Sequence, residues 1–169
     1  MSLSMYQASA PVFVTMLNNL AAILEKAEAH AKEHKIEESV LLNWRFAPDM
    51  FPLTRQVQIA ADFAKSVSAR LAGVEPPSYE DSETSFVELH ARIARTQAFI
   101  AGLEAAKFDG AETREIVLRP GTPKERRFNG QTYLLHYGLP QFFFHVTTAY
   151  ALLRHNGVGI GKKDYMGAY

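Results

Sequence analysis

The clearest structural signal is LTRQVQIAADFAKSVSARL, the sequence of residues 53–71. Its apolar side chains recur at alternating steps of three and four, the spacing that places them on one face of a helix. They are Leu53, Val57, Ala60, Ala64, Val67 and Leu71. Gly73, followed by Pro76 and Pro77, ends this pattern. We therefore predict an amphipathic helix over residues 53–71, with its apolar face against a helical core.

Three further segments have the same apolar spacing, at about residues 9–34, 85–103 and 140–155. Ser9 and Ser85 stand where a helix N-cap is favoured, because a hydroxyl there accepts a hydrogen bond from a free backbone N–H. Each of the four helices needs partners that bury its apolar face. Together they predict an all-α fold, a four-helix bundle.

A small β-hairpin is expected between the last two long helices. Residues 114–119 and 125–128 have the composition of short strands, and they flank a turn that contains proline and glycine. No linker or internal repeat divides the chain, so we expect a single domain over residues 1–169. Within it, residues 1–4 are expected to be disordered or non-native, and residues 157–169 to form a flexible tail.

Composition excludes several classes of function. The chain has 169 residues, of which 47% are hydrophobic and 21% charged, as in ordinary globular domains. Its 18 basic and 18 acidic side chains cancel, which removes the broad positive field that nucleic acids or acidic membranes attract. Residues 134–153 lack charged side chains but include glycine, proline and histidine, so we predict a buried helix there. We expect a cytoplasmic protein with neither a nucleic-acid nor a membrane partner.

The connection between Ile36 and Pro52 is unusually apolar for a loop. It carries the apolar run VLL at 40–42 and then Trp44, Phe46 and Phe51, and its two prolines break helices. An exposed cluster of such rings would associate with other surfaces. We therefore expect this loop to fold back over the core and to close one end of the bundle.

Polar side chains on two apolar helix faces mark a candidate site. Gln56 falls inside the apolar sector of the 53–71 helix, whereas Gln58 and Asp62 point away from it. On the last helix, Gln141, His145 and Thr148 share a stripe that is polar without being charged. In one interpretation these side chains, with His136 or Tyr133, line a cleft that binds a small molecule or a metal. In the other they form a satisfied core network or a solvated stripe.

Four sequence runs strongly resemble the bacterial family DUF1993, over nearly the whole chain from Met5 onward. They are RFAPDMFPL at 45–53, QVQ at 56–58, YLLH at 133–136 and FHVTTAYALLRHNG at 144–157. This family is similar to the DinB-like superfamily of four-helix bundles, which are often dimeric and include metalloenzymes and metal-dependent thiol transferases. The resemblance implies a metal site with one histidine from the second long helix and a His-x-x-x-His pair from the last.

This chain departs from that pattern. Aligning its helix end LRHNG, residues 153–157, on the superfamily places the pair at Gln141 and His145, so only His145 matches. No histidine occurs between Leu53 and Gly73, and Gln56 is the nearest occupant of the inner face. An amide oxygen is a poor zinc ligand beside imidazole. We expect no bound cofactor, with weak zinc or nickel binding at His145 as the alternative.

Three hypotheses follow. The first is a small-molecule-binding bundle with a degenerate metal site. The second is a transferase or hydrolase in which His145 acts as general base, or as a lone metal ligand aided by His136, His155 or water. The third is an interaction module that forms a homodimer, because Phe142, Phe143 and Phe144 together cover most of the circumference of the last helix. We prefer the first, with Gln56, Gln141, His145, His136, Tyr133 and Thr148 as its site residues.

Overall fold

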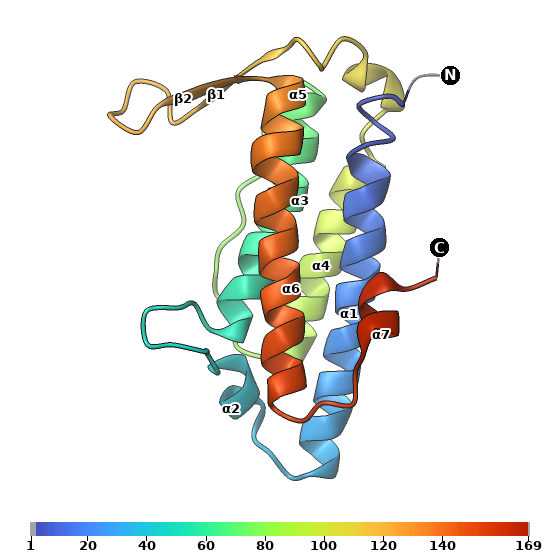
Figure 1. Cartoon of the computed structure of the whole chain (residues 1–169), viewed down its shortest axis with the longest axis vertical. Coiled ribbons are helices and arrows are strands. Elements are labelled where there is room, and N and C mark those ends of the chain that lie inside the picture. The colour runs from blue at the N-terminus through green and yellow to red at the C-terminus, as the bar shows by residue number, and fades with distance from the viewer. Residues whose placement is uncertain (1–2, 169) are drawn as a thin grey trace.

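The computed structural model describes residues 3–168 and shows a bundle of four long helices (Figure 1). These are α1 (Ala10–Glu33), α3 (Leu53–Leu71), α4 (Phe86–Ala101) and α6 (Leu139–His155). The predicted four-helix bundle is confirmed. Following the chain colours, α1 and α6 run in one direction and α3 and α4 in the other. Because α3 and α4 are parallel, the chain must return along the bundle between them.

Shorter elements close the two ends. At one end lie α2 (Glu38–Leu42) and the loop that precedes α3; at the other lie the 3₁₀ turn η1 (Ala105–Phe108) and the hairpin, β1 (Glu115–Leu118) and β2 (Arg126–Asn129). The strands are antiparallel, with Ile116 opposite Phe128. The predicted hairpin is thus confirmed, and it projects sideways from the bundle (Figure 1). The chain then enters α6 through α5 (Gly130–Thr132) and a π-helical turn, η2 (Tyr133–Gly138).

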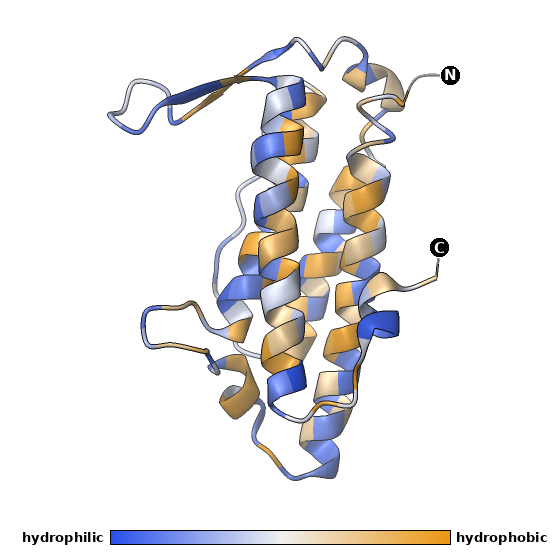
Figure 2. Cartoon of the chain, viewed as in Figure 1, coloured by the Kyte–Doolittle hydropathy of each residue, from blue (hydrophilic) through white to orange (hydrophobic). Residues whose placement is uncertain are grey.

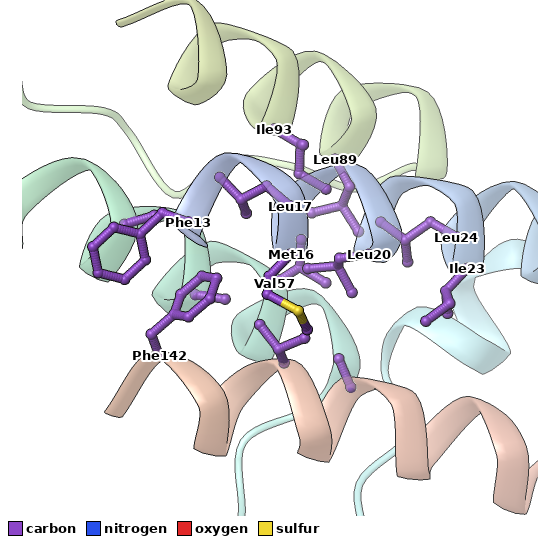
Figure 3. Close-up of a cluster of buried hydrophobic side chains, with 14 of the residues drawn as sticks. Phe13, Met16, Leu17, Leu20, Ile23, Leu24, Val57, Leu89, Ile93 and Phe142 are labelled. Carbon is purple, nitrogen blue, oxygen red and sulfur yellow. The ribbon is translucent and has the colours of Figure 1, made fainter. Parts of the chain in front are cut away.

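The core is built from the apolar stripes that the sequence displays. Figure 3 shows the α1 side chains meeting those of α3, α4 and α6, with Phe13 packed edge-on against Phe142 at a centroid distance of 4.9 Å. The hairpin, by contrast, carries mainly hydrophilic residues (Figure 2). Burial of the helix faces excludes water from large apolar side chains, which is the main stabilising term for such a bundle.

The π-helical turn can approach α3 closely because it ends on glycine. A Cβ atom on Gly138 would lie 2.8 Å from Val67 Cγ2, closer than side chains tolerate. Glycine at this position therefore allows the backbone of η2 to pack directly against α3. This contact sets where Tyr133 and Tyr137, two residues of η2, lie relative to α3.

The crossover segment, residues 72–85, covers the side of α3 that faces away from the core. It descends the outside of the bundle from the end of α3 to the start of α4 (Figure 1). Gln58 lies on that side, as predicted, but it is buried and its Nε2 donates to Glu83 Oε2 at 2.8 Å. Lys65 is buried there as well. Consequently α3 is enclosed around almost its whole circumference.

The C-terminal segment differs from the predicted flexible tail. Gly157 ends α6 with a φ of +85°, as a C-capping glycine does, but Val158 and Ile160 are buried immediately after it. The helix α7 (Lys162–Met166) then packs on α1, where Asn19 Nδ2 donates to the Tyr165 carbonyl at 3.0 Å. Burial of Val158 and Ile160 and the contact between α7 and α1 therefore hold this segment against the bundle. At the other terminus, residues 1–2 of the segment 1–4 lie outside the described residues.

Several large apolar side chains remain at the surface. The α2 helix buries Leu41 and Leu42, so this end of the bundle is closed as predicted. The rings of the following loop do not fold into the core, since Phe51 remains 54% exposed and Trp44 and Phe46 lie against the exposed His155. On α6, Phe142 is buried, but Phe144 is 56% exposed. The homodimer stays a prediction.

No helix within residues 3–168 combines the length and apolar composition that a bilayer crossing requires.

Candidate functional site

The inner faces of α3 and α6 bring two polar side chains together. Gln56 of α3 is 2% exposed and His145 of α6 is 7% exposed. The two are joined by a hydrogen bond of 2.7 Å between Gln56 Oε1 and His145 Nδ1. The amide nitrogen of Gln56 donates in turn to the carbonyl of Phe51 at 3.0 Å. The inward placement expected for both side chains therefore agrees with the structure.

These contacts determine the tautomer of His145. The Phe51 carbonyl can only accept, so the Gln56 amide must turn its NH₂ group toward Phe51 and its oxygen toward the imidazole. An amide oxygen can only accept, so His145 Nδ1 carries a proton and donates it. In the neutral ring, Nε2 then bears the lone pair. Within residues 3–168 the ring makes one hydrogen bond, through Nδ1, so the Nε2 lone pair is unused.

Burial also controls the charge of this ring. Desolvation, followed by the positive charge of Arg55, lowers the pKa of His145 from 6.5 to about 4. The ring of Phe63 is stacked on the imidazole at 6.1 Å between centroids, and Phe144 contacts it edge-on at 5.2 Å. At neutral pH the site therefore presents an uncharged acceptor nitrogen within aromatic surroundings.

We expect His145 to remain in the neutral Nδ1–H form well below pH 6, as long-range ¹⁵N–¹H NMR of the ring can show. Because its folded pKa of about 4 lies below the unfolded value of 6.5, the unfolded chain binds this proton more readily between those values. The contribution of this pKa shift to the free energy of unfolding is complete above about pH 6.5. It is lost as the pH falls toward 4, by about 2–3 kcal/mol in total. Urea unfolding of the protein and of a His145→Gln variant isolates this contribution. A ring that protonates near pH 6.5 would contradict the buried pair.

A recess along the same face of α6 holds two more of the predicted site residues. Gln141, half-buried one turn before His145, and the exposed His136 line a hollow of about 270 Å³. Tyr137, Pro140 and Phe144 complete its walls. Since residues four apart share a helix face, Gln141 and His145 lie on the same side of α6. The recess is thus a mixed polar and aromatic surface that begins one helical turn from His145, although neither His145 nor Gln56 lines it.

The remaining two predicted residues lie elsewhere. Thr148 donates its hydroxyl to the Phe144 carbonyl at 2.7 Å, so its polar group is used within α6. Tyr133 lines a second hollow under the hairpin, where its hydroxyl accepts from Arg70 Nη1 at 3.3 Å. The two hollows share Tyr137. The single cleft expected from the sequence is therefore divided, because η2 places the ring of Tyr137 at the border of both.

The donor atoms at this position do not fit the zinc site that the DinB resemblance implies. Among residues 3–168, no group of three or more histidine, cysteine, aspartate or glutamate side chains is arranged to hold a metal ion. At the position that the resemblance implies for the metal stand one imidazole and two amides, and the Gln56 oxygen already accepts the Nδ1 proton. Tight zinc sites rely on imidazole, thiolate or carboxylate ligands.

Sequence reasoning missed a buried arginine on the opposite side of α3. Arg92 of α4 is fully buried and pairs with Asp62 at 3.0 Å, Asp81 at 2.9 Å and Glu83 at 2.9 Å. Burial opposes its charge, but the Glu83 hydrogen bond and the three acidic charges raise the pKa of Arg92 overall. The available signal was its position three residues after the core residue Leu89, within the apolar stripe. This network ties the crossover segment to both helices.

Comparisons with known proteins identify a family and solved structures of the same fold. The model of the family DUF1993, a domain of unknown function, matches residues 5–166. The crystal structure of a DinB family member protein from Shewanella denitrificans is 44% identical, with a TM-score of 0.91. The match covers 97% of this chain and 92% of that chain. No curated protein matches. The chain belongs to the DUF1993 family, and its bundle is that of a DinB-like protein.

Proposed function

We propose that this protein is a small-molecule-binding bundle in which the metal position of DinB-like proteins has become a neutral hydrogen-bonding site. The supporting observation is the 2.7 Å hydrogen bond between Gln56 and His145. This bond uses the Nδ1 proton of His145 and leaves Nε2 free to accept a hydrogen bond. A ligand with an O–H or N–H donor and an apolar body is the complementary chemistry.

The adjoining recess supports the same proposal. Gln141 offers an amide beside the rings of Tyr137 and Phe144, and the hollow has room for a small ring compound. The alternative of general-base catalysis at His145 is less well supported. A pKa of about 4 leaves the ring unprotonated at neutral pH but makes it a weak base.

Phenol and anisole provide a matched pair of probes, because anisole has the same ring but cannot donate a hydrogen bond. We expect phenol, but not anisole, to shift the ¹⁵N resonance of His145 Nε2 in a saturable way, with a Kd on the order of 1–10 mM. A Gln141→Ala variant should weaken the phenol response several-fold, whereas Gln58→Ala, which lies under the crossover segment, should leave it unchanged. Equal responses to the two probes, or no response to either, would refute the proposed acceptor site.

A further inference from the structure

A second hollow of about 200 Å³ lies between α3, η2 and the hairpin. It is lined by residues of all three elements, and neither Gln56 nor His145 contributes to it. Its chemistry therefore goes beyond the proposed function, and it can be tested separately.

Two arginines without acidic partners border this hollow. Arg70 of α3 donates to the Tyr133 hydroxyl at 3.3 Å and to the Ser66 carbonyl at 3.4 Å. Arg119 follows β1 in the left-handed backbone region, with a φ of +53°. Neither takes part in an ion pair within the described part of the chain. A guanidinium offers a fork of donors that matches a carboxylate.

The one acidic side chain of the lining is already compensated. Asp62 accepts from Lys65 Nζ at 2.9 Å and from Arg92 Nη2 at 3.0 Å, both on the side of the crossover segment. Arg92 is shared with Asp81 and Glu83, so the charge of Asp62 is offset mainly by Lys65, which does not line the hollow. The arginines consequently give this hollow a positive character.

Tyr133 adds a donor that the protein does not use. Its side chain is 1% exposed, and its oxygen accepts from Arg70. The hydroxyl hydrogen has no acceptor among residues 3–168, although a buried O–H normally finds one. Burial raises the pKa of Tyr133, so the group stays protonated and able to donate at neutral pH.

Aromatic rings form the remaining walls. Tyr137 stacks on Tyr133 at 5.8 Å and contacts Phe63 at 5.8 Å. An apolar protein cavity of about 150 Å³ holds one benzene ring. The hollow is thus sized for a single six-membered ring that carries one small polar substituent.

We propose that this hollow binds a monocyclic aromatic carboxylate. The carboxylate lies against Arg70, Arg119 and the Tyr133 hydroxyl, and the ring lies against Phe63 and Tyr137. Two guanidinium groups and one O–H supply enough donors for both oxygens of the carboxylate.

Benzoate and benzamide test this directly, because they share shape but differ in charge. In ¹⁵N-HSQC titrations of the whole chain at low salt, we expect benzoate to bind with a Kd on the order of 1 mM and benzamide at least about tenfold more weakly. Shifts should centre on Tyr133, Tyr137 and Leu118. Arg119→Gln should weaken benzoate binding about fivefold to tenfold. The matched control Lys124→Gln removes a positive charge from the same hairpin outside the hollow, and it should leave the Kd unchanged.

The remaining variants separate this site from the Gln56–His145 pair. Arg70→Gln should weaken benzoate binding at least as much as Arg119→Gln does. If the Arg70→Gln variant does not fold, the Arg119→Gln variant still tests the proposal, because Arg119 is more exposed. Gln141→Ala, which should weaken the phenol response, should leave benzoate binding unchanged, because Gln141 does not line this hollow. Equal affinity for benzoate and benzamide, an equal effect of Lys124→Gln, or absence of benzoate binding up to about 20 mM would overturn the proposal.

Discussion

Replacing Arg92 with methionine is expected to lower the free energy of unfolding by about 3–5 kcal/mol, because it removes one partner of a buried ionic network. The guanidinium bonds Asp62, Asp81 and Glu83, and also the carbonyl of Glu80 at 2.9 Å. Without it, Asp62 keeps Lys65 and Asp81 keeps Arg55. Glu83, whose side chain is 9% exposed, keeps only the amide of Gln58 and is left largely desolvated. Methionine has a similar volume, so loss of charge rather than a cavity dominates the change.

Urea denaturation at neutral pH measures this effect. Arg95→Met is the matched control, since Arg95 lies one turn later on α4, is exposed and stacks over Tyr79 at 3.7 Å. Its loss should cost under about 1 kcal/mol. A loss of similar size for Arg92→Met would mean that the three carboxylates regain water and that the network does not hold the crossover segment in place.

This network shows why only part of the fold follows from apolar periodicity. The stripe from Leu53 to Leu71 identifies one buried face of α3 and predicts its packing correctly. The opposite face, with Gln58 and Lys65, is polar in sequence and would be solvated on an isolated helix. It is buried because α3 and α4 are parallel, which sends the aperiodic crossover segment back along the bundle. Helix direction is a tertiary property, which the spacing within one helix does not encode.

The candidate site, too, could be predicted only in part from helical periodicity. Helical rotation alone is sufficient to place Gln56 and His145 inward. The tautomer of His145 depends on the Phe51 carbonyl, which belongs to a loop whose path has no periodic signal. Likewise, Tyr133 and Arg119 become neighbours only because Gly138 lets η2 pack on α3 and because the hairpin leaves the bundle at one particular angle. Contacts between side chains that irregular segments bring together are therefore the contacts that helical periodicity does not predict.

Placing histidines at the positions that the DinB resemblance implies for metal ligands is expected to produce the second large effect. The double variant Gln56→His, Gln141→His should bind Zn²⁺ at least about 10³-fold more tightly than the natural chain, because two imidazoles replace two amides around His145. Gln56 Oε1 already lies 2.7 Å from the His145 ring, so position 56 is close enough to share an ion with it. Position 141 lies one helical turn before His145, the spacing of a His-x-x-x-His pair.

Isothermal titration with Zn²⁺ and metal analysis of untagged protein, purified without chelator, measure this gain against the natural chain, which should carry less than stoichiometric zinc or nickel. Zinc at about 100 times its Kd should also stabilise the double variant by about 2.7 kcal/mol in thermal unfolding, an effect that EDTA reverses.

Gln58→His, Gln141→His is the matched control, because Gln58 faces Glu83 under the crossover segment rather than His145. If the control binds zinc as tightly as the first variant, the ion does not sit between α3 and α6, and the Gln56–His145 pair is not the successor of a metal site. Stoichiometric zinc in the natural chain would show instead that one imidazole and two amides suffice, which would make the neutral hydrogen-bonding role of His145 untenable.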